Sequence, residues 1–369
     1  MADGILSEVE RRDRLRLIRS ENVGPVAFTQ LLRRYETAAA ALAAIPELAR
    51  RAGKKSIRIA SIMEAEREIA DLAKLGGRFV ARGEPDYPPL LAQIEDAPPL
   101  LAVRGFPHIW KRPCLAMVGA RNASLNAQKF ARMLAGELGQ AGLAIVSGLA
   151  RGIDTAAHQG SLATGTVAVM AGGIDVVYPA ENAALFARIV ETGAAISEVR
   201  LGEAPQARHF PRRNRIVSGV SLGTLVVEAA LRSGSLITAR LAGEQGREVL
   251  SVPGSPLDPR AGGSNDLLRQ GATLVETARD VLDAILRRPI SEPDKPDEKS
   301  FSNICNIDEI AVEKARETIL SILAPAPTSV DEIVRECQLS APVVLAALLE
   351  LELVGAIDRH PGNRVSRRH

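Results

Sequence analysis

Cysteine, aromatic residues and long apolar runs are all scarce in this 369-residue sequence. The three cysteines, Cys114, Cys305 and Cys337, lie far apart, which excludes a metal-spaced pair and an even disulfide set. No apolar run approaches the roughly eighteen residues that cross a bilayer. The segment from Met1 to Arg14 is too charged for a secretory signal. We therefore expect reduced cysteines, no membrane partner and a cytoplasmic location.

Neither sign of charge dominates the chain, whose formal net charge is +2. With 46% hydrophobic and 24% charged residues, the composition is typical of a soluble globular protein. The global charge does not indicate a nucleic-acid partner, so such a partner must be sought in local clusters. The segment from Arg200 to Arg215 holds five arginines and a single acid, Glu203. It is the most basic organised segment of the chain.

Apolar patterning predicts a helical beginning followed by a large α/β core. Residues 10–80 have helical periodicity. From residue 114 to about 286, short apolar runs without polar alternation are separated by segments of crossover-helix length, such as Gln128–Gln140 and Ala183–Thr192. Strands that are apolar on both faces belong in a parallel sheet covered by helices. The expected fold is therefore α/β, with a Rossmann-like, doubly wound and mostly parallel sheet.

A linker and a second small domain are expected after the core. Residues 289–300 hold three prolines and six charges, so they cannot build a core. Three helices at 312–323, 329–336 and 340–353, followed by two short strands, are typical of a winged helix. The predicted domains are an N-terminal all-α domain at 1–80, the core at 81–288, the linker at 289–308 and a winged-helix-like domain at 309–369.

The segment Asn22-Val23-Gly24-Pro25 lies between two expected helices, with glycine for the turn and proline at a first helical position. It is similar to a helix-hairpin-helix or SAM-like turn, whose backbone amides can bind a DNA phosphate. A plain turn between helices explains the segment at least as well.

Two turns that follow strands are candidates for phosphate binding. The first, Gly119 to Ser124, lacks the second glycine of a dinucleotide fingerprint, but it offers free amides and Arg121 at the carboxyl edge of the sheet. The second runs from Ser147 through Gly148 and Arg151 to Asp154. Asp154 and His158, four residues apart, could form an acid/base pair or half a metal site. We favour helix capping by Asp154, which would also orient His158, because no third ligand is spaced nearby; no metal or cofactor is expected.

The segment from His209 to Arg215 combines one aromatic residue with arginines. This is the chemistry that stacks a base and grips neighbouring phosphates. The alternative is a solvated, charged helix start. Further along, hydroxyl groups follow Glu228 at another helix start, where they could bind a phosphate or simply cap the helix. These hydroxyls belong to Ser233, Ser235 and Thr238.

The P-loop and zinc-peptidase signatures are absent. Gly53-Lys54-Lys55-Ser56 resembles the end of a P-loop, but Leu48 replaces the required glycine, so we expect no ATP site. The sequence also lacks the zinc-peptidase motif HExxH. We therefore do not expect an enzyme.

Six stretches, in this order, resemble the DprA/Smf family of DNA-processing proteins over about residues 80–285. They are Met117–Arg121, Val146–His158, Tyr178–Pro179, Phe210–Arg215, Ser233–Ala239 and Val252–Gly254. The first turn departs from the family pattern, because Ala120 stands where the family usually has a hydroxyl residue.

The resemblance implies a protein that binds single-stranded DNA, protects it and helps to load the RecA recombinase during natural transformation, in competence and DNA recombination. It implies a homodimer formed through the core, and DNA contacts at Arg121, Phe210 and the arginines nearby. Together with the motifs described above, the resemblance predicts a set of DNA-binding residues. That set is Gly119, Arg121, Ser124, Ser147, Gly148, Arg151, Phe210, Arg212, Arg213, Asn214, Arg215, Ser233, Ser235 and Thr238.

Two other functions remain open from the sequence. Proteins similar to nucleotide-processing phosphoribohydrolases place a glycine-rich turn and a glutamate at the same sheet edge, and Glu228 is the candidate here. A DNA-binding regulator that acts through the winged helix is the other alternative. The sequence does not indicate what the two terminal domains do or which surface meets the recombinase.

Overall fold

The computed structural model describes residues 4–286, 309–360 and 362–368. The described chain divides into two compact units. The first, which we call the core unit, contains residues 68–286 together with residues 4 and 5. The second, the terminal unit, contains residues 6–67 and the described residues from 309 onward. The expected linker at 289–308 lies outside the described residues, and the predicted domain boundaries stay predictions.

A nine-stranded sheet forms the centre of the core unit, with the strand order β1-β2-β6-β5-β4-β3-β7-β8-β9. The strands from β3 to β9 run parallel, whereas β1 and β2 pair antiparallel at one edge, β2 against β6. Strands β3 to β7 are buried throughout, as their continuous apolar runs predict. The strands are β1 (Gly77–Ala81), β2 (Leu100–Gly105), β3 (Cys114–Val118), β4 (Ala144–Ser147), β5 (Thr166–Val169), β6 (Ala194–Ser197), β7 (Gly223–Val226), β8 (Glu248–Ser251) and β9 (Thr273–Leu274).

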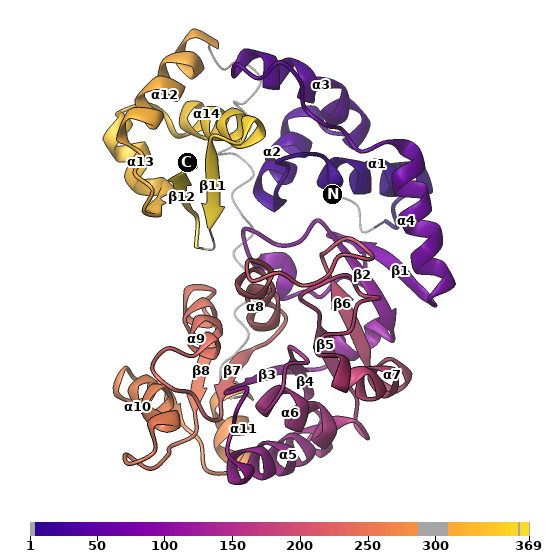
Figure 1. The fold of residues 1–369 in the computed structure, drawn as a ribbon, viewed down its shortest axis with the longest axis vertical. Coiled ribbons are helices and arrows are strands. Elements are labelled where there is room, and N and C mark those ends of the chain that lie inside the picture. The colour runs from indigo at the N-terminus through magenta and orange to yellow at the C-terminus, as the bar shows by residue number, and fades with distance from the viewer. Residues whose placement is uncertain (1–3, 287–308, 361, 369) are drawn as a thin grey trace. The chain divides into compact units, whose positions relative to one another are not determined.

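Helices cover both faces of this sheet (Figure 1). On one face, α5 (Leu125–Gln140), α6 (Ile153–Ser161) and α11 (Ala278–Leu286) bury an apolar cluster against β3, β4 and β7. On the other, α8 (His209–Gly219), α9 (Gly234–Glu244) and α10 (Gly262–Arg269) pack over a second cluster. The helix α7 (Ala183–Thr192) precedes β6. This confirms the predicted Rossmann-like, mostly parallel core. The carboxyl ends of β3, β4 and β5 meet at one edge, where ligands bind in such sheets.

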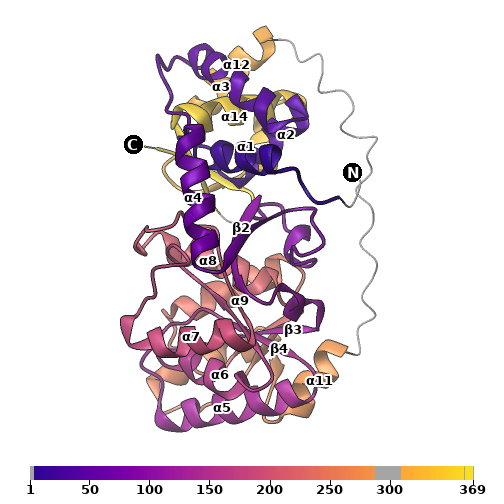
Figure 2. The same cartoon turned by 90° about the vertical axis from the view of Figure 1, so that its right-hand side faces the viewer.

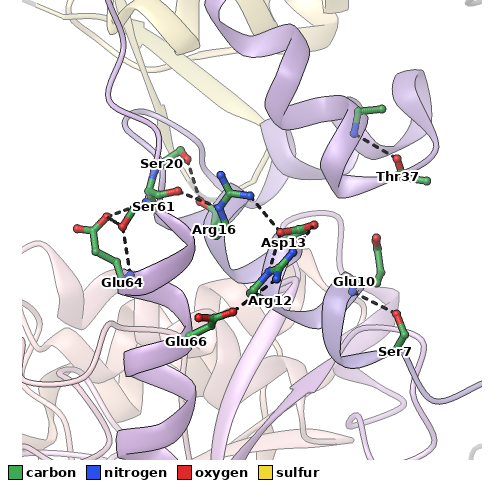
Figure 3. A network of polar contacts seen from close by, with 12 residues as sticks. Ser7, Glu10, Arg12, Asp13, Arg16, Ser20, Thr37, Ser61, Glu64 and Glu66 are labelled. Atoms are coloured by element: carbon green, nitrogen blue, oxygen red, sulfur yellow. Dashed lines mark hydrogen bonds and ion pairs between the residues drawn. The ribbon is translucent and has the colours of Figure 1, made fainter.

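The terminal unit begins with α1 (Glu8–Arg19), α2 (Pro25–Tyr35) and α3 (Ala38–Arg51). Polar contacts connect α1 to the segment that precedes α4 (Ile62–Lys74): Arg16 donates to the carbonyl of Ala60, and the amide of Ala60 donates to the Ser20 hydroxyl. Arg16 is also ion-paired with Asp13 at 3.1 Å (Figure 3). These contacts hold the N-terminal helices as a packed domain.

The rest of the terminal unit is a winged helix with its own apolar core. Its helices are α12 (Glu309–Ile322), α13 (Val330–Cys337) and α14 (Ala341–Val354), and its three-stranded sheet has the order β10-β12-β11. The strands are β10 (Thr328–Ser329), β11 (Ile357–His360) and β12 (Arg364–Arg367). Among the described residues, no single helix is long and apolar enough to cross a bilayer. Helices α13 and α14 meet that criterion only as a pair bent by 117°, and both contribute to this core.

Candidate nucleic-acid interface

A small cavity of about 60 Å³ opens where β3, β4 and β5 end. We call it the Phe210 pocket. Its lining comes from the turns after these strands and from the first turn of α8. The residues that matter here are Arg121, Gly148, Arg151, Met170, Tyr178 and Phe210. Turns that are distant in the sequence converge because parallel strands end at a common edge.

An aromatic pair and a guanidinium group line this pocket. The rings of Tyr178 and Phe210 meet edge to face, with 6.0 Å between their centroids. The guanidinium carbon of Arg121 lies 4.8 Å from the centroid of the Phe210 ring. Tyr178 is 54% exposed, although a tyrosine of a folded core usually buries more of its ring. The pocket therefore combines flat apolar surfaces with a positive charge.

Arg213, in contrast, is buried and has a structural role. Its Nη1 donates to the carbonyl of Val169 at 2.9 Å. A Cβ at Gly148 would stand 1.6 Å from that same Nη1, so only glycine lets the guanidinium pass. Burial lowers the pKa of Arg213, and the neighbouring Asp154 opposes this shift. The expectation that Arg213 contacts DNA phosphate directly is therefore corrected: it positions the turn after β4.

Asp154 holds the same turn from its other side. Its Oδ2 accepts hydrogen bonds from the amides of Gly148 at 3.1 Å and Ala150 at 3.3 Å. Burial raises the pKa of its carboxyl group, and the charge of Arg213 opposes that shift. The expectation that Asp154 caps the helix is wrong, because Gly152 is the N-cap of α6 and Asp154 binds the turn before it. The expectation that Asp154 orients His158 is not met either, because the Nδ1 of His158 pairs with the hydroxyl of Thr166 at 2.8 Å. Among the described residues, no group of three or more potential metal ligands lies together.

Arg215 also has a structural role. It is 4% exposed and ion-paired with Glu198 and, at 3.4 Å, with Asp96. Its Nη1 donates to the backbone carbonyl of Asp96 at 2.6 Å. The prediction of a direct phosphate contact by Arg215 is corrected in the same way. Of the arginines on α8, Arg212 is exposed and can reach a polymer.

Arg151 lines the Phe210 pocket and is exposed. Its guanidinium forms a two-pronged ion pair with the carboxylate of Glu181, at 2.9 and 3.1 Å. Both side chains are more than half exposed, so this pair contributes little stability. A phosphate can therefore compete with Glu181 for Arg151 at small cost.

The turn after β3 is already occupied by an internal anion. The Glu228 carboxylate accepts from the Ser124 amide at 2.9 Å and from its hydroxyl at 2.7 Å. The Ser124 hydroxyl also caps α5 by accepting from the Ala127 amide. Gly119 packs against Ile153 so closely that a Cβ there would stand 2.5 Å from that side chain. Glu228 thus fills the anion position at the start of α5, beside a cavity of about 270 Å³.

The remaining hydroxyl candidates act as local caps or core groups. Ser147 is fully buried and donates to the carbonyl of Met117 at 2.7 Å. Ser233 caps α9 and shares a hydrogen bond with the Ser235 hydroxyl at 2.7 Å. Asn214 donates to the carbonyl of Gly234, which connects α8 to α9. Thr238 is 2% exposed. None of these groups lines the Phe210 pocket.

The sequence pointed to Arg121, Gly148, Arg151 and Phe210, which the structure brings together. It missed Tyr178 as a site residue. The signal for it was present, because Tyr178 follows β5 shortly after the strand reaches the same edge as β3 and β4.

Comparisons with known proteins agree in all three parts of the chain. The family model for DNA recombination-mediator protein A matches residues 78–286. The model for a DprA-like N-terminal HHH domain matches residues 8–70, and the DprA winged helix domain matches residues 308–363.

Individual relatives give the same result. Protein Smf of Escherichia coli K12 is 40% identical over 285 residues, which cover 76% of this chain and 75% of Smf. The X-ray structure of DprA from Streptococcus pneumoniae aligns with a TM-score of 0.62 and 36% identity, covering 74% of this chain and 96% of that one. A Helicobacter pylori DprA structure, described for its single-stranded DNA binding mode, aligns with a TM-score of 0.53 and 26% identity, covering 57% of this chain and 95% of that one.

Proposed function

This chain belongs to the DprA/Smf family, and on that premise we propose that it binds single-stranded DNA at the Phe210 pocket. The bound strand is DNA taken up in natural transformation, which the protein protects and passes to a RecA-type recombinase. Family membership supports this role, and the H. pylori relative is described as binding single-stranded DNA.

The observation that carries the proposal is the arrangement of Phe210, Tyr178 and Arg121 around one small cavity. Each base offers a flat π-face, so an aromatic platform accepts any sequence, and stacking contributes about 1–3 kcal/mol per base. Arg121 supplies the positive charge for the adjoining phosphate. Arg151 and Arg212 are exposed and extend the positive charge along the strand.

We propose no catalytic activity. The alternative of a nucleotide-processing enzyme requires a free Glu228 carboxylate, but both oxygens of this carboxylate accept hydrogen bonds from Ser124. A carboxylate that caps a helix in this way is poorly placed to attack or protonate a nucleotide. An arginine-lined surface also suits a polymer better than a single nucleotide.

The proposed homodimer forms through the C-terminal half of the core unit. Support comes from exposed apolar side chains there: Leu231 is 67% and Leu257 is 93% exposed. Light scattering at micromolar concentration should give twice the monomer mass. Leu231→Glu with Leu257→Glu should reduce the mass to that of one chain, and a parent protein of monomer mass would contradict the proposal.

Fluorescence anisotropy with labelled single-stranded DNA, duplex DNA and a mononucleotide, each at two salt concentrations, tests the function. We expect single strands to bind most tightly, with an affinity that falls as salt rises. Preference for the mononucleotide would favour the alternative of a nucleotide-processing enzyme. Preference for the duplex would favour a regulator that acts through its winged helix.

A further inference from the structure

The third helix of a winged helix normally reads DNA, and α14 occupies that place in this chain. Helices that read DNA carry arginine, lysine, asparagine or glutamine toward the bases. The sequence of α14, APVVLAALLELELV, contains none of these, and its only charged residues are Glu350 and Glu352. By composition, α14 is unsuited to lie in a DNA groove.

Both sides of α14 are covered by protein. One side, with Val344, Leu348 and Leu351, belongs to the core of the winged helix. Leu349 and Leu353, four residues apart and therefore on one face, are 3% and 0% exposed. Helix α14 packs against α3 and α2 of the N-terminal helices, and the two views of the ribbon agree (Figures 1 and 2). The face of α14 that carries Leu349 and Leu353 is thus covered within this unit, where the N-terminal helices α2 and α3 pack against α14.

The contact centres on the hairpin turn before α2. The Asn22 side-chain amide donates to the carbonyl of Leu353 at 3.0 Å. A Cβ at Gly24 would stand 2.9 Å from Oε1 of Glu352, so this carboxylate lies against the turn. The N-cap residue of α2 is Gly24, which has no side chain with which to cap the helix. A carboxylate therefore lies where the positive N-terminal end of α2 would attract a phosphate.

Charge complementarity supports the contact. Burial raises the pKa of Glu350, and the charges of Arg316, of Arg34 on α2 and of Arg51 on α3 oppose that shift. Glu352 is also held within the winged helix by Arg359 at 2.6 Å. The acidic end of α14 thus lies within electrostatic range of the basic last turns of α2 and α3.

We propose that the winged helix is an intramolecular cap on the helix-hairpin-helix, in which the acidic end of α14 takes the place of a nucleic-acid phosphate at the Asn22–Pro25 turn. The phosphates of duplex DNA reach this turn only when α14 is displaced. This inference does not depend on the Phe210 pocket, which lies in the core unit and is proposed to take single strands.

The test compares two full-length double variants that gain the same charge. Glu350→Gln with Glu352→Gln removes the acidic cap, whereas Glu332→Gln with Glu336→Gln removes two exposed acids of α13 in the same domain. Anisotropy with a short labelled duplex is measured over a salt series. The cap variant should bind more tightly than the control, with a slope of log affinity against log salt that is steeper by about 0.9 for each additional phosphate neutralised. Equal affinities and slopes in the two variants would overturn the proposal.

A second variant approaches the contact from the hairpin. Asn22→Gly tolerates the positive φ of this residue, which is 57°, and removes the donor to Leu353. It should increase duplex affinity in the same direction, and it decides the question if the glutamine variant does not fold. Hydrogen exchange on the parent protein gives an independent result. Saturating duplex should accelerate exchange in α14, and unchanged exchange would also overturn the proposal.

Discussion

Phe210 and Arg121 are neighbours in the Phe210 pocket, yet they should contribute to DNA binding in different ways. Neutralising a phosphate releases counterions, so a variant that neutralises one phosphate fewer on a single strand has a slope of log affinity against log salt that is shallower by about 0.7. Arg121→Ala should therefore weaken binding and flatten the slope by that amount. Phe210→Ala removes a stacking platform worth about 1–3 kcal/mol, which weakens binding by about 5- to 150-fold, and should leave the slope unchanged.

The controls are a second aromatic residue and a second arginine of the core unit. Phe106, at 46% exposure, follows β2 and lies outside the lining of the pocket. Arg188 is exposed on α7. Anisotropy with a labelled single strand over a salt series should give Phe106→Ala and Arg188→Ala the affinity and slope of the parent.

Two results would refute this reasoning. If Arg121→Ala and Phe210→Ala both bind like the parent, the strand lies elsewhere. If Phe210→Ala flattens the slope, the ring positions Arg121 and does not stack on a base. The 4.8 Å separation makes that second result a real alternative. The double variant measures it, because a guanidinium held over the ring couples the effects of the two substitutions by about 0.5–1 kcal/mol.

Three further predictions concern the residues around the pocket. Arg213→Ala should lower the free energy of unfolding in a denaturant titration by about 1–3 kcal/mol, because it leaves the buried carbonyl of Val169 without its donor and the buried Asp154 without the positive charge near it. The exposed neighbour change Arg212→Ala should keep stability and flatten the salt slope. Equal stability losses in the two variants would contradict this. Glu228→Ala should lower the melting temperature, because the amide and hydroxyl of Ser124 lose their carboxylate partner at a cost of about 1–3 kcal/mol. Neither the variant nor the parent should release free base from nucleoside monophosphates; base release by the parent that the variant lacks would restore the enzyme hypothesis. Burial lowers the pKa of His158 to about 3, so below about pH 6.5 this histidine is protonated in the unfolded chain but stays neutral in the folded one. Between pH 6.5 and pH 5 the free energy of unfolding of the parent should therefore fall by about 2 kcal/mol relative to that of His158→Gln. Equal pH dependence of the two unfolding free energies would show that His158 titrates normally.

The core strands could be predicted because a parallel sheet buried on both faces requires continuous apolar runs. The short apolar runs expected after residue 114 include β3 to β8, and Ala183–Thr192 is α7 as expected. The hairpin of β1 and β2 was not predicted from the sequence. Residues 77–80 were assigned to the helical region, and only pairing with β2 makes Gly77–Ala81 a strand. In the winged helix, β10 has two residues, too few to give a pattern.

The site was predicted less completely, because adjacent arginines look alike in a sequence. Arg213 lies three and four residues before Ile216 and Val217, which places it on the buried face of α8, so this part of the signal was available. Arg215 is different. Its partners Glu198 and Asp96 come from distant loops, and local spacing does not indicate such pairs. Glu228 likewise reaches Ser124 across more than a hundred positions in the sequence.

The basic segment on α8 therefore combines two physical roles that the sequence presents as one motif. Phe210 and Arg212 are accessible, whereas Arg213 and Arg215 are buried and hold the loops around them. Burying a guanidinium is costly unless its donors are satisfied, so a buried arginine is useful only where it fixes a geometry. Arg213 does this by passing over Gly148 to reach the end of β5, which sets the turn that lines the Phe210 pocket. A strand of DNA can then meet Arg121 and Phe210 already in place, and less of the binding free energy is lost in ordering them.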